Sequence, residues 1–198
     1  MTVASDMDGT EEVNEKAGIL AEVCSALTTG RRSEAAAMVS ARYPFAPLAS
    51  AERRYSPRQL TGLHRRDGFI DRYSGTRLVC PGALRLLSKL LPEQFPFHSN
   101  WKADACHFAF YELFPTLDHI VPVSRGGPDA AENWVTTSML RNSAKANFTL
   151  DELGWRIHPP GDMTQWDGLL GWFIGWIDSE RSVLDDPYLR RWHQAARE

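Results

Sequence analysis

The chain has 198 residues, a formal net charge of −3 and a hydrophobic fraction of 43%. A chain of this length and composition can bury a substantial core, which excludes an intrinsically disordered protein. No apolar run approaches the roughly twenty residues that cross a bilayer, and the first residues lack the basic and apolar regions of a signal peptide. The three cysteines show no pairing pattern. We therefore expect a cytoplasmic protein that has no membrane partner.

Residues 1–54 predict a helical N-terminal region that leads into a basic linker. Residues 10–29 have helical periodicity and end at Gly30; the apolar face, which we expect to be buried, holds Val13, Ala17, Leu20, Val23, Cys24 and Leu27. A second helix is predicted over residues 32–39. Residues 31–66 carry a net charge of +6, which suits contacts with nucleic-acid phosphates. The alternative is an exposed linker whose arginines pair with the acidic termini.

Residues 55–157 predict a region of short elements joined by turns. In chain order these are a turn at residues 71–75, a helix from Pro81, an aromatic segment at 108–114 and strands over 116–122 and 134–137. Gly126 and Gly127 lie in the loop between the two strands. A helix that carries Asn142 near its start follows, and Thr149–Glu152 is a capping box for another short helix.

Residues 158–198 predict an amphipathic helical extension. Its apolar positions recur at helical spacing and are Trp166, Leu169, Leu170, Trp172, Phe173, Trp176 and Ile177. Such a face packs either on the core or on a second copy, so a homodimer through this Trp-rich helix is one expectation. A final short helix is predicted from Pro187. The fold class expected for the whole chain is α+β, mainly helical around one small pair of strands.

The most informative motif lies near the middle of the chain. Asp118 and His119 close a short apolar strand, Asn133 follows fourteen positions after His119, and Asn142 lies nine positions further on. A phosphodiester resists attack because its charge repels nucleophiles, and a bound cation offsets that charge. A carboxylate and an amide oxygen with no thiolate nearby suit Mg²⁺ or Mn²⁺ better than Zn²⁺. An imidazole can take a proton from water when its other ring nitrogen is held by an acceptor.

The order and spacing of these residues resemble the HNH endonuclease family, whose catalytic unit is a two-stranded ribbon packed on one helix and is called the ββα-metal fold. The resemblance is strongest over residues 111–155 and includes a zinc-free bacterial group whose signature ends in Asn. It implies that His119 is the general base and that Asp118 and Asn142 hold a divalent ion, Mg²⁺ in the first place. It also implies that Asn133 orients the base.

Many HNH proteins brace this unit with a structural zinc between two Cys-x-x-Cys knuckles, and this chain has no such pair. The corresponding positions hold Asp71, Ser74, Ser138 and Arg141. We therefore expect no structural zinc. Our hypothesis is that a salt bridge between Asp71 and Arg141 replaces it, with the two serines hydrogen-bonding nearby. The alternative is two independent solvated charges.

The expected activity is metal-dependent endonucleolytic hydrolysis of phosphodiester bonds, with DNA as the nucleic-acid partner. Lys145 could face the substrate phosphate, and Arg65, Arg66 and Arg125 are further candidates for phosphate contacts. Two alternatives stay open. The first is an RNA-cleaving nuclease, because a ribbon and a helix recognise backbone shape. The second is a catalytically silent nucleic-acid-binding module, which the lost zinc positions and the acidic total charge favour.

Overall fold

The structure of the protein is a computed structural model that describes residues 6–45 and 54–198. Contacts within the chain divide it into two compact units, Met1–Ala51 and Glu52–Glu198. The fold is α+β, because the described ranges are mainly helical and contain one two-stranded antiparallel sheet. Within these ranges, no helix has both the length and the apolar character needed to cross a membrane.

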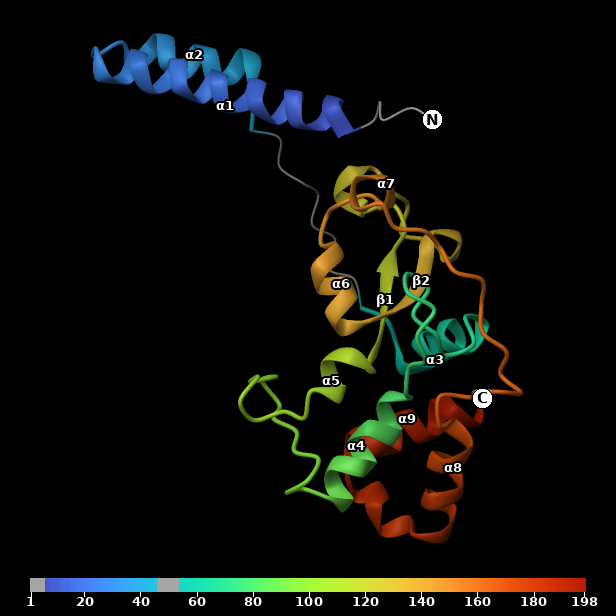
Figure 1. Cartoon of the computed structure of the whole chain (residues 1–198). Coiled ribbons are helices and arrows are strands. Elements are labelled where there is room, and N and C mark those ends of the chain that lie inside the picture. The colour runs from blue at the N-terminus through green and yellow to red at the C-terminus, as the bar shows by residue number, and fades with distance from the viewer. Residues whose placement is uncertain (1–5, 46–53) are drawn as a thin grey trace. The chain divides into compact units, whose positions relative to one another are not determined.

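The two units are built from short elements, which Figure 1 shows in chain order. The first unit contains α1 (Asp6–Thr28) and α2 (Arg32–Arg42). The helices of the second unit are α3 (Pro57–Arg66), α4 (Pro81–Leu90), α5 (Ala109–Glu112), α6 (Met139–Lys145), α7 (Leu150–Leu153), α8 (Leu170–Ser179) and α9 (Pro187–Arg197). Its strands are β1 (Pro115–His119) and β2 (Trp134–Ser138), and its 3-10 turns are Val123–Arg125, Ala131–Asn133 and Arg181–Asp185. The helices predicted from residues 10, 32, 81 and 187 are confirmed, with ends that differ by a few residues.

The first unit is a helical hairpin in which one face of α1 packs on α2. Its buried side chains are Ile19, Val23, Ala26 and Ala35, with Met38 and Val39 partly buried beside them. An ion pair of 2.5 Å between Glu22 and Arg42 also joins the two helices. The prediction that Cys24 is buried is wrong. Its side chain is exposed because α2 covers only the neighbouring side of the apolar stripe.

The core of the second unit lies where α4, α8 and α9 meet (Figure 1). Its largest members include Phe69, Leu84, Phe110, Phe173, Ile177, Leu189 and Trp192. Gly82 allows α8 to approach α4, because a Cβ there would come within 2.4 Å of the Phe173 ring. The C-terminal residues 158–198 therefore share the core of this unit. Trp172 and Trp176 stay partly exposed on α8, and a homodimer through that helix remains a prediction.

The strand pair and the helix after it place the predicted catalytic residues. β1 and β2 pair antiparallel, from Pro115 opposite Ser138 to His119 opposite Trp134. α6 follows β2 directly and contacts both strands, and α3 packs on the same pair (Figure 1). The side chain of Ser138 accepts a hydrogen bond from the Arg141 backbone and so caps α6. Because β1 ends at His119, the loop between the strands starts directly after this residue.

His64 of α3 is completely buried against the strand pair. Its Nδ1 lies 3.1 Å from Thr136 Oγ1, and its Nε2 has no hydrogen-bond partner in the described part of the chain. Burial lowers the pKa of His64 to about 3, from an ordinary value of 6.5. Between these values the unfolded chain binds one more proton than the folded protein. The contribution of His64 to stability is therefore lost as the pH falls below 6.5.

We expect the free energy of unfolding to fall by about 2 kcal/mol between pH 7 and pH 5 through His64 alone. Replacing His64 by Gln removes the titrating group, so the stability of the variant should depend less on pH over this range. Urea unfolding of both proteins at the two pH values measures this dependence. Equal pH dependence in the two proteins would contradict the assignment, whatever their absolute stabilities.

Candidate active site

The predicted catalytic pair lies at the end of β1 and lines a small cavity. Asp118 and His119 are 8% and 9% exposed. The cavity has a volume of 140 Å³, and its other lining residues are Pro122, Val123, Ser124, Ala146 and Asn147. Such a volume admits a few water molecules. A carboxylate and an imidazole thus reach one polar space between the loop after β1 and the residues after α6.

The Asp118 carboxylate is held through one of its two oxygens. Oδ2 accepts a hydrogen bond of 2.6 Å from the Tyr73 hydroxyl and lies 3.0 Å from Lys145 Nζ. Burial, and then the charge of Asp118, raise the pKa of Tyr73, so this hydroxyl stays a donor. Oδ1 has no hydrogen-bond partner among the described residues and is the oxygen left for a ligand.

Lys145 is fully buried and does not face a substrate phosphate as expected. Its Nζ donates to the His119 carbonyl at 2.7 Å and pairs with Asp118. The reason is its place in the last turn of α6, where the side chain reaches back under the end of β1. Lys145 therefore contacts both Asp118 and His119 from inside the protein.

His119 is held by a residue that the sequence analysis missed. Its Nε2 lies 2.8 Å from Asp129 Oδ1. The same oxygen accepts hydrogen bonds from the Tyr55 hydroxyl at 2.6 Å and from Trp134 Nε1 at 2.9 Å. The bond from Tyr55, and then that from His119, lower the pKa of Asp129, so its carboxylate is charged at neutral pH. When Nε2 carries the proton that faces Asp129, Nδ1 keeps its lone pair.

Asn133 acts on the loop and does not bond the imidazole. Its Oδ1 accepts from the Val121 backbone at 2.9 Å, and its Nδ2 donates to the carbonyls of Val121 and Pro128 at 2.9 and 2.8 Å. Gly127 is required at this crossing, because a Cβ there would lie 2.0 Å from the Val121 carbonyl oxygen. The predicted orienting role of Asn133 is therefore indirect: it fixes the loop that carries Asp129.

Asn142 lies in the middle of α6 and not at its start. Its Nδ2 donates to Thr116 Oγ1 at 3.0 Å and to the Leu117 carbonyl at 3.1 Å, which ties the helix to β1. Asn142 does not line the cavity, whereas Asn147 does. Ser124 donates to Asn147 Oδ1 at 2.9 Å across the cavity mouth. Asn147 is thus a second residue that sequence spacing did not single out.

The donor set at this cavity fits a magnesium ion that keeps most of its water. In the described ranges no three His, Cys, Asp or Glu side chains gather as a metal-binding group. Magnesium is commonly held through one or two carboxylates and retained water, so a single carboxylate oxygen and an amide are compatible with it. Asp118 would bind through Oδ1, with the amide oxygen of Asn147 as the second protein donor, since Asn142 does not line the cavity. The absence of thiolates disfavours zinc.

The three arginines that were expected to contact substrate phosphates form hydrogen bonds or ion pairs within the protein. Arg65 donates to the Ala196 carbonyl of α9. Arg66 donates to the carbonyls of Ala131 and Trp134 at 2.8 and 2.5 Å, which ties α3 to the start of β2. Arg125 pairs with Glu152 at 2.9 Å, and Glu152 completes the predicted capping box of α7. None of the three lines the cavity at His119, so their phosphate contacts remain predictions.

The salt bridge expected between Asp71 and Arg141 is present only as a long ion pair, and Asp71 is held mainly by hydrogen bonds. Arg141 Nε lies 3.9 Å from Asp71 Oδ2, which is too long for a hydrogen bond. Asp71 is completely buried and accepts from the backbone of Tyr73 and Ser138 and from Thr137 Oγ1, at 2.9, 3.0 and 3.1 Å. Arg141 turns instead to the Trp155 ring, 5.3 Å from its centre. One carboxylate thus joins the 71–75 turn to β2.

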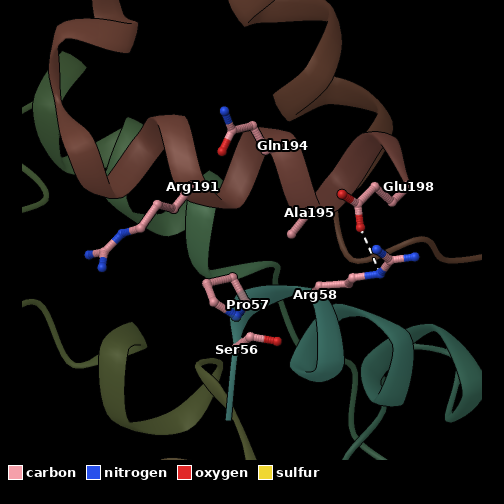
Figure 2. A pocket seen from close by; sticks show the side chains of 7 residues that line it. All are labelled: Ser56, Pro57, Arg58, Arg191, Gln194, Ala195 and Glu198. Atoms are coloured by element: carbon pink, nitrogen blue, oxygen red, sulfur yellow. Dashed lines mark ion pairs between the residues drawn. The ribbon is translucent and has the colours of Figure 1, made fainter. Parts of the chain in front are cut away.

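A second cavity lies between the start of α3 and α9 (Figure 2), and neither Asp118 nor His119 lines it. It has a volume of 180 Å³ and is lined by Ser56, Pro57, Arg58, Arg191, Gln194, Ala195 and Glu198. Arg58 and Glu198 form an ion pair of 2.8 Å, drawn in Figure 2, and both side chains are exposed. Arg191 is a further basic side chain in the lining, besides the paired Arg58 and Glu198.

Comparisons with protein-family models, with curated proteins and with solved structures find no match for the chain. Its candidate site is therefore interpreted from its own geometry. The residues that meet there come from β1, the loop between the strands, and the end of α6.

Proposed function

We propose that the chain is a metal-dependent endonuclease of the HNH type that hydrolyses phosphodiester bonds, with DNA as its substrate. The observation that supports this most is the 2.8 Å contact of His119 Nε2 with Asp129, next to the Asp118 carboxylate in one cavity. An imidazole held by a carboxylate on one nitrogen is suited to take a proton on the other. The succession of β1, loop, β2 and α6 also has the order of the ββα unit that the sequence resembles.

In the proposed mechanism His119 Nδ1 takes a proton from a water molecule in the cavity, and the water oxygen attacks the phosphorus atom. The bond from phosphorus to the leaving oxygen breaks, and that oxygen takes a proton from solvent. Asp129 accepts the hydrogen bond from Nε2 and stabilises the imidazolium that forms. A divalent ion held at Asp118 would supply positive charge for the phosphoryl and leaving oxygens. Lys145 and Tyr73 keep the Asp118 carboxylate in place.

Replacing Asp129 by Asn is expected to lower kcat roughly tenfold or more, with little change in KM, because the imidazolium loses its charged partner. Single-turnover cleavage of a short DNA duplex measures the effect. Tyr55→Phe is the matched control, since it removes a donor to Asp129 but keeps the contact between Asp129 and His119. A wild-type kcat in Asp129→Asn would show that this contact does not serve catalysis.

The direct test of the proposed function is nicking of supercoiled plasmid by the purified chain with Mg²⁺, with Mn²⁺ and with EDTA. Nicking that needs the metal ion supports the proposal. The residues at the cavity are proposed to act on the phosphodiester and do not contact the sugar, so they do not distinguish DNA from RNA. A parallel time course on matched single-stranded and duplex DNA and RNA decides between the two substrates. No cleavage of any substrate with either ion would overturn the enzyme assignment.

The second candidate is a catalytically silent nucleic-acid-binding module, and one contact favours it. The ammonium group of Lys145 lies 3.0 Å from Asp118 Oδ2 and already neutralises much of the charge that a metal ion needs. Salt-dependent binding of duplex DNA without cleavage in Mg²⁺ or Mn²⁺ is the result expected for this candidate. Metal-dependent cleavage excludes it.

A further inference from the structure

The exposed side of α1 carries a second apolar stripe, next to the one that packs on α2. Its described members are Ala17, Leu20, Cys24 and Leu27, and all of them are exposed. Leu20 is 45% exposed and Leu27 is 49% exposed. Their alternating spacing of three and four residues is the pattern of a seam by which one helix packs along another. The apolar surface of α1 therefore extends beyond the part that α2 covers.

The described core of the helical hairpin is small. Its described residues bury four apolar side chains, Ile19, Val23, Ala26 and Ala35. Folded units of about 40 residues usually need a disulfide, a metal ion or association with another chain. In the described part of the hairpin there is no metal-binding group, and the thiol of Cys24 is free. Association through the open stripe would enlarge the described core.

We infer that the stripe binds the same stripe of a second copy of the chain, with the two α1 helices antiparallel, so that two hairpins form a four-helix bundle. The sizes of the residues fit this arrangement. Small Ala17 and Cys24 alternate with large Leu20 and Leu27. An antiparallel pair centred at residue 22 sets Ala17 opposite Leu27 and Leu20 opposite Cys24. Every large side chain then meets a small one, as close helix packing requires.

The distribution of charge favours the antiparallel direction. Glu11 and Glu15 lie toward the start of α1, and the last turn of α1 has no basic residue. Arg31 lies in the short connection between α1 and α2, and Arg32 is the first residue of α2; Arg31 also pairs with Glu34 within its own hairpin. Parallel helices would bring the acidic starts together. Antiparallel helices place the acidic start of each copy beside the arginines of the other, which lowers the repulsion.

Sedimentation equilibrium of the full chain tests the inference. We expect twice the chain mass of 22.3 kDa for the wild type, and the chain mass for the double variant Leu20→Glu with Leu27→Glu. Ser25→Glu is the matched control, because Ser25 is also exposed on α1 but lies outside the stripe. Circular dichroism checks that all three proteins keep their helices. A monomeric wild type overturns the inference.

The reactivity of Cys24 toward a maleimide gives a second measurement that does not depend on the variants folding. Cys80 and Cys106 are buried, so Cys24 is the exposed thiol that labels first. We expect slow labelling in the concentrated wild type and fast labelling after dilution. If the protein is a monomer and Cys24 is labelled slowly, another part of the same chain covers the stripe. If Cys24 is labelled fast at high concentration, the stripe is open. Either result overturns the inference.

A spin label tests the direction of the helices. In the Cys24→Ser background, a label at Asn14→Cys is expected about 24 Å from its copy along an antiparallel pair centred at residue 22. A parallel pair would bring the two labels to about 10 Å. A distance in the shorter range would overturn the antiparallel arrangement. This inference stands independently of the proposed nuclease activity.

Discussion

Replacing His119 by alanine is expected to lower the rate of phosphodiester cleavage by about 100-fold or more, while nucleic-acid binding is retained. The loss follows because Nδ1 is the proposed proton acceptor and Asp129 cannot replace it from behind the ring. His119 lines the cavity and is not part of the apolar core, so the variant should keep its fold. Single-turnover cleavage and equilibrium binding, measured on the same duplex, separate the two effects.

The matched control is His98→Ala. His98 lies in the loop between α4 and α5, where its Nδ1 accepts a hydrogen bond from the Asn100 backbone, and it does not line the cavity. We expect wild-type cleavage from this variant. If His119→Ala and the wild type cleave at equal rates, the assignment of His119 as general base is wrong and any activity belongs to another site.

Replacing Asp71 by alanine is expected to lower the free energy of unfolding by about 3 kcal/mol or more. The substitution leaves three buried donors, the backbone of Tyr73 and Ser138 and the hydroxyl of Thr137, without their acceptor. Each unsatisfied buried donor costs about 1–3 kcal/mol. Urea unfolding followed by tryptophan fluorescence measures the change. The 71–75 turn and β2 should separate first, because Asp71 is what joins them.

Arg141→Met tests whether the hydrogen bonds of Asp71 or its ion pair with Arg141 join the 71–75 turn to β2. Arg141 is partly exposed and 3.9 Å from Asp71, so its removal is expected to cost less than about 1 kcal/mol. A methionine keeps some apolar contact with the Trp155 ring, over which the guanidinium now lies. Equal destabilisation by the two substitutions would restore the ion pair as the brace between the two segments.

Features that depend on neighbouring residues could be predicted from the sequence. Gly30 ends α1, Pro81 and Pro187 begin helices, and Thr149 and Glu152 form their capping box. In each case the backbone preference or the side-chain bond acts within about one turn of helix. The strands next to Asp118 and Asn133 were also predictable, because turn residues bound a short apolar run.

Features that depend on contacts distant in the chain could not be predicted. Lys145 donates a hydrogen bond to the His119 carbonyl at the end of β1, and Asp129 accepts one from the Tyr55 hydroxyl, 74 residues away in the chain. No local pattern distinguishes such an Asp or Lys from a solvated one. Periodicity places Cys24 on an apolar stripe but does not show how much of the width of that stripe a partner helix covers, so its exposure could not be predicted. These interactions require the tertiary structure.

The second unit is closed by contacts between its first and last helices. α3 packs on α9, and Arg65 bonds Ala196 across a separation of 131 residues. Contacts so distant in the chain form late, because a long loop must close before they are made. During synthesis, α3 and β1 are made well before α9. We therefore expect the second unit to complete its fold only once α9 has packed on α3.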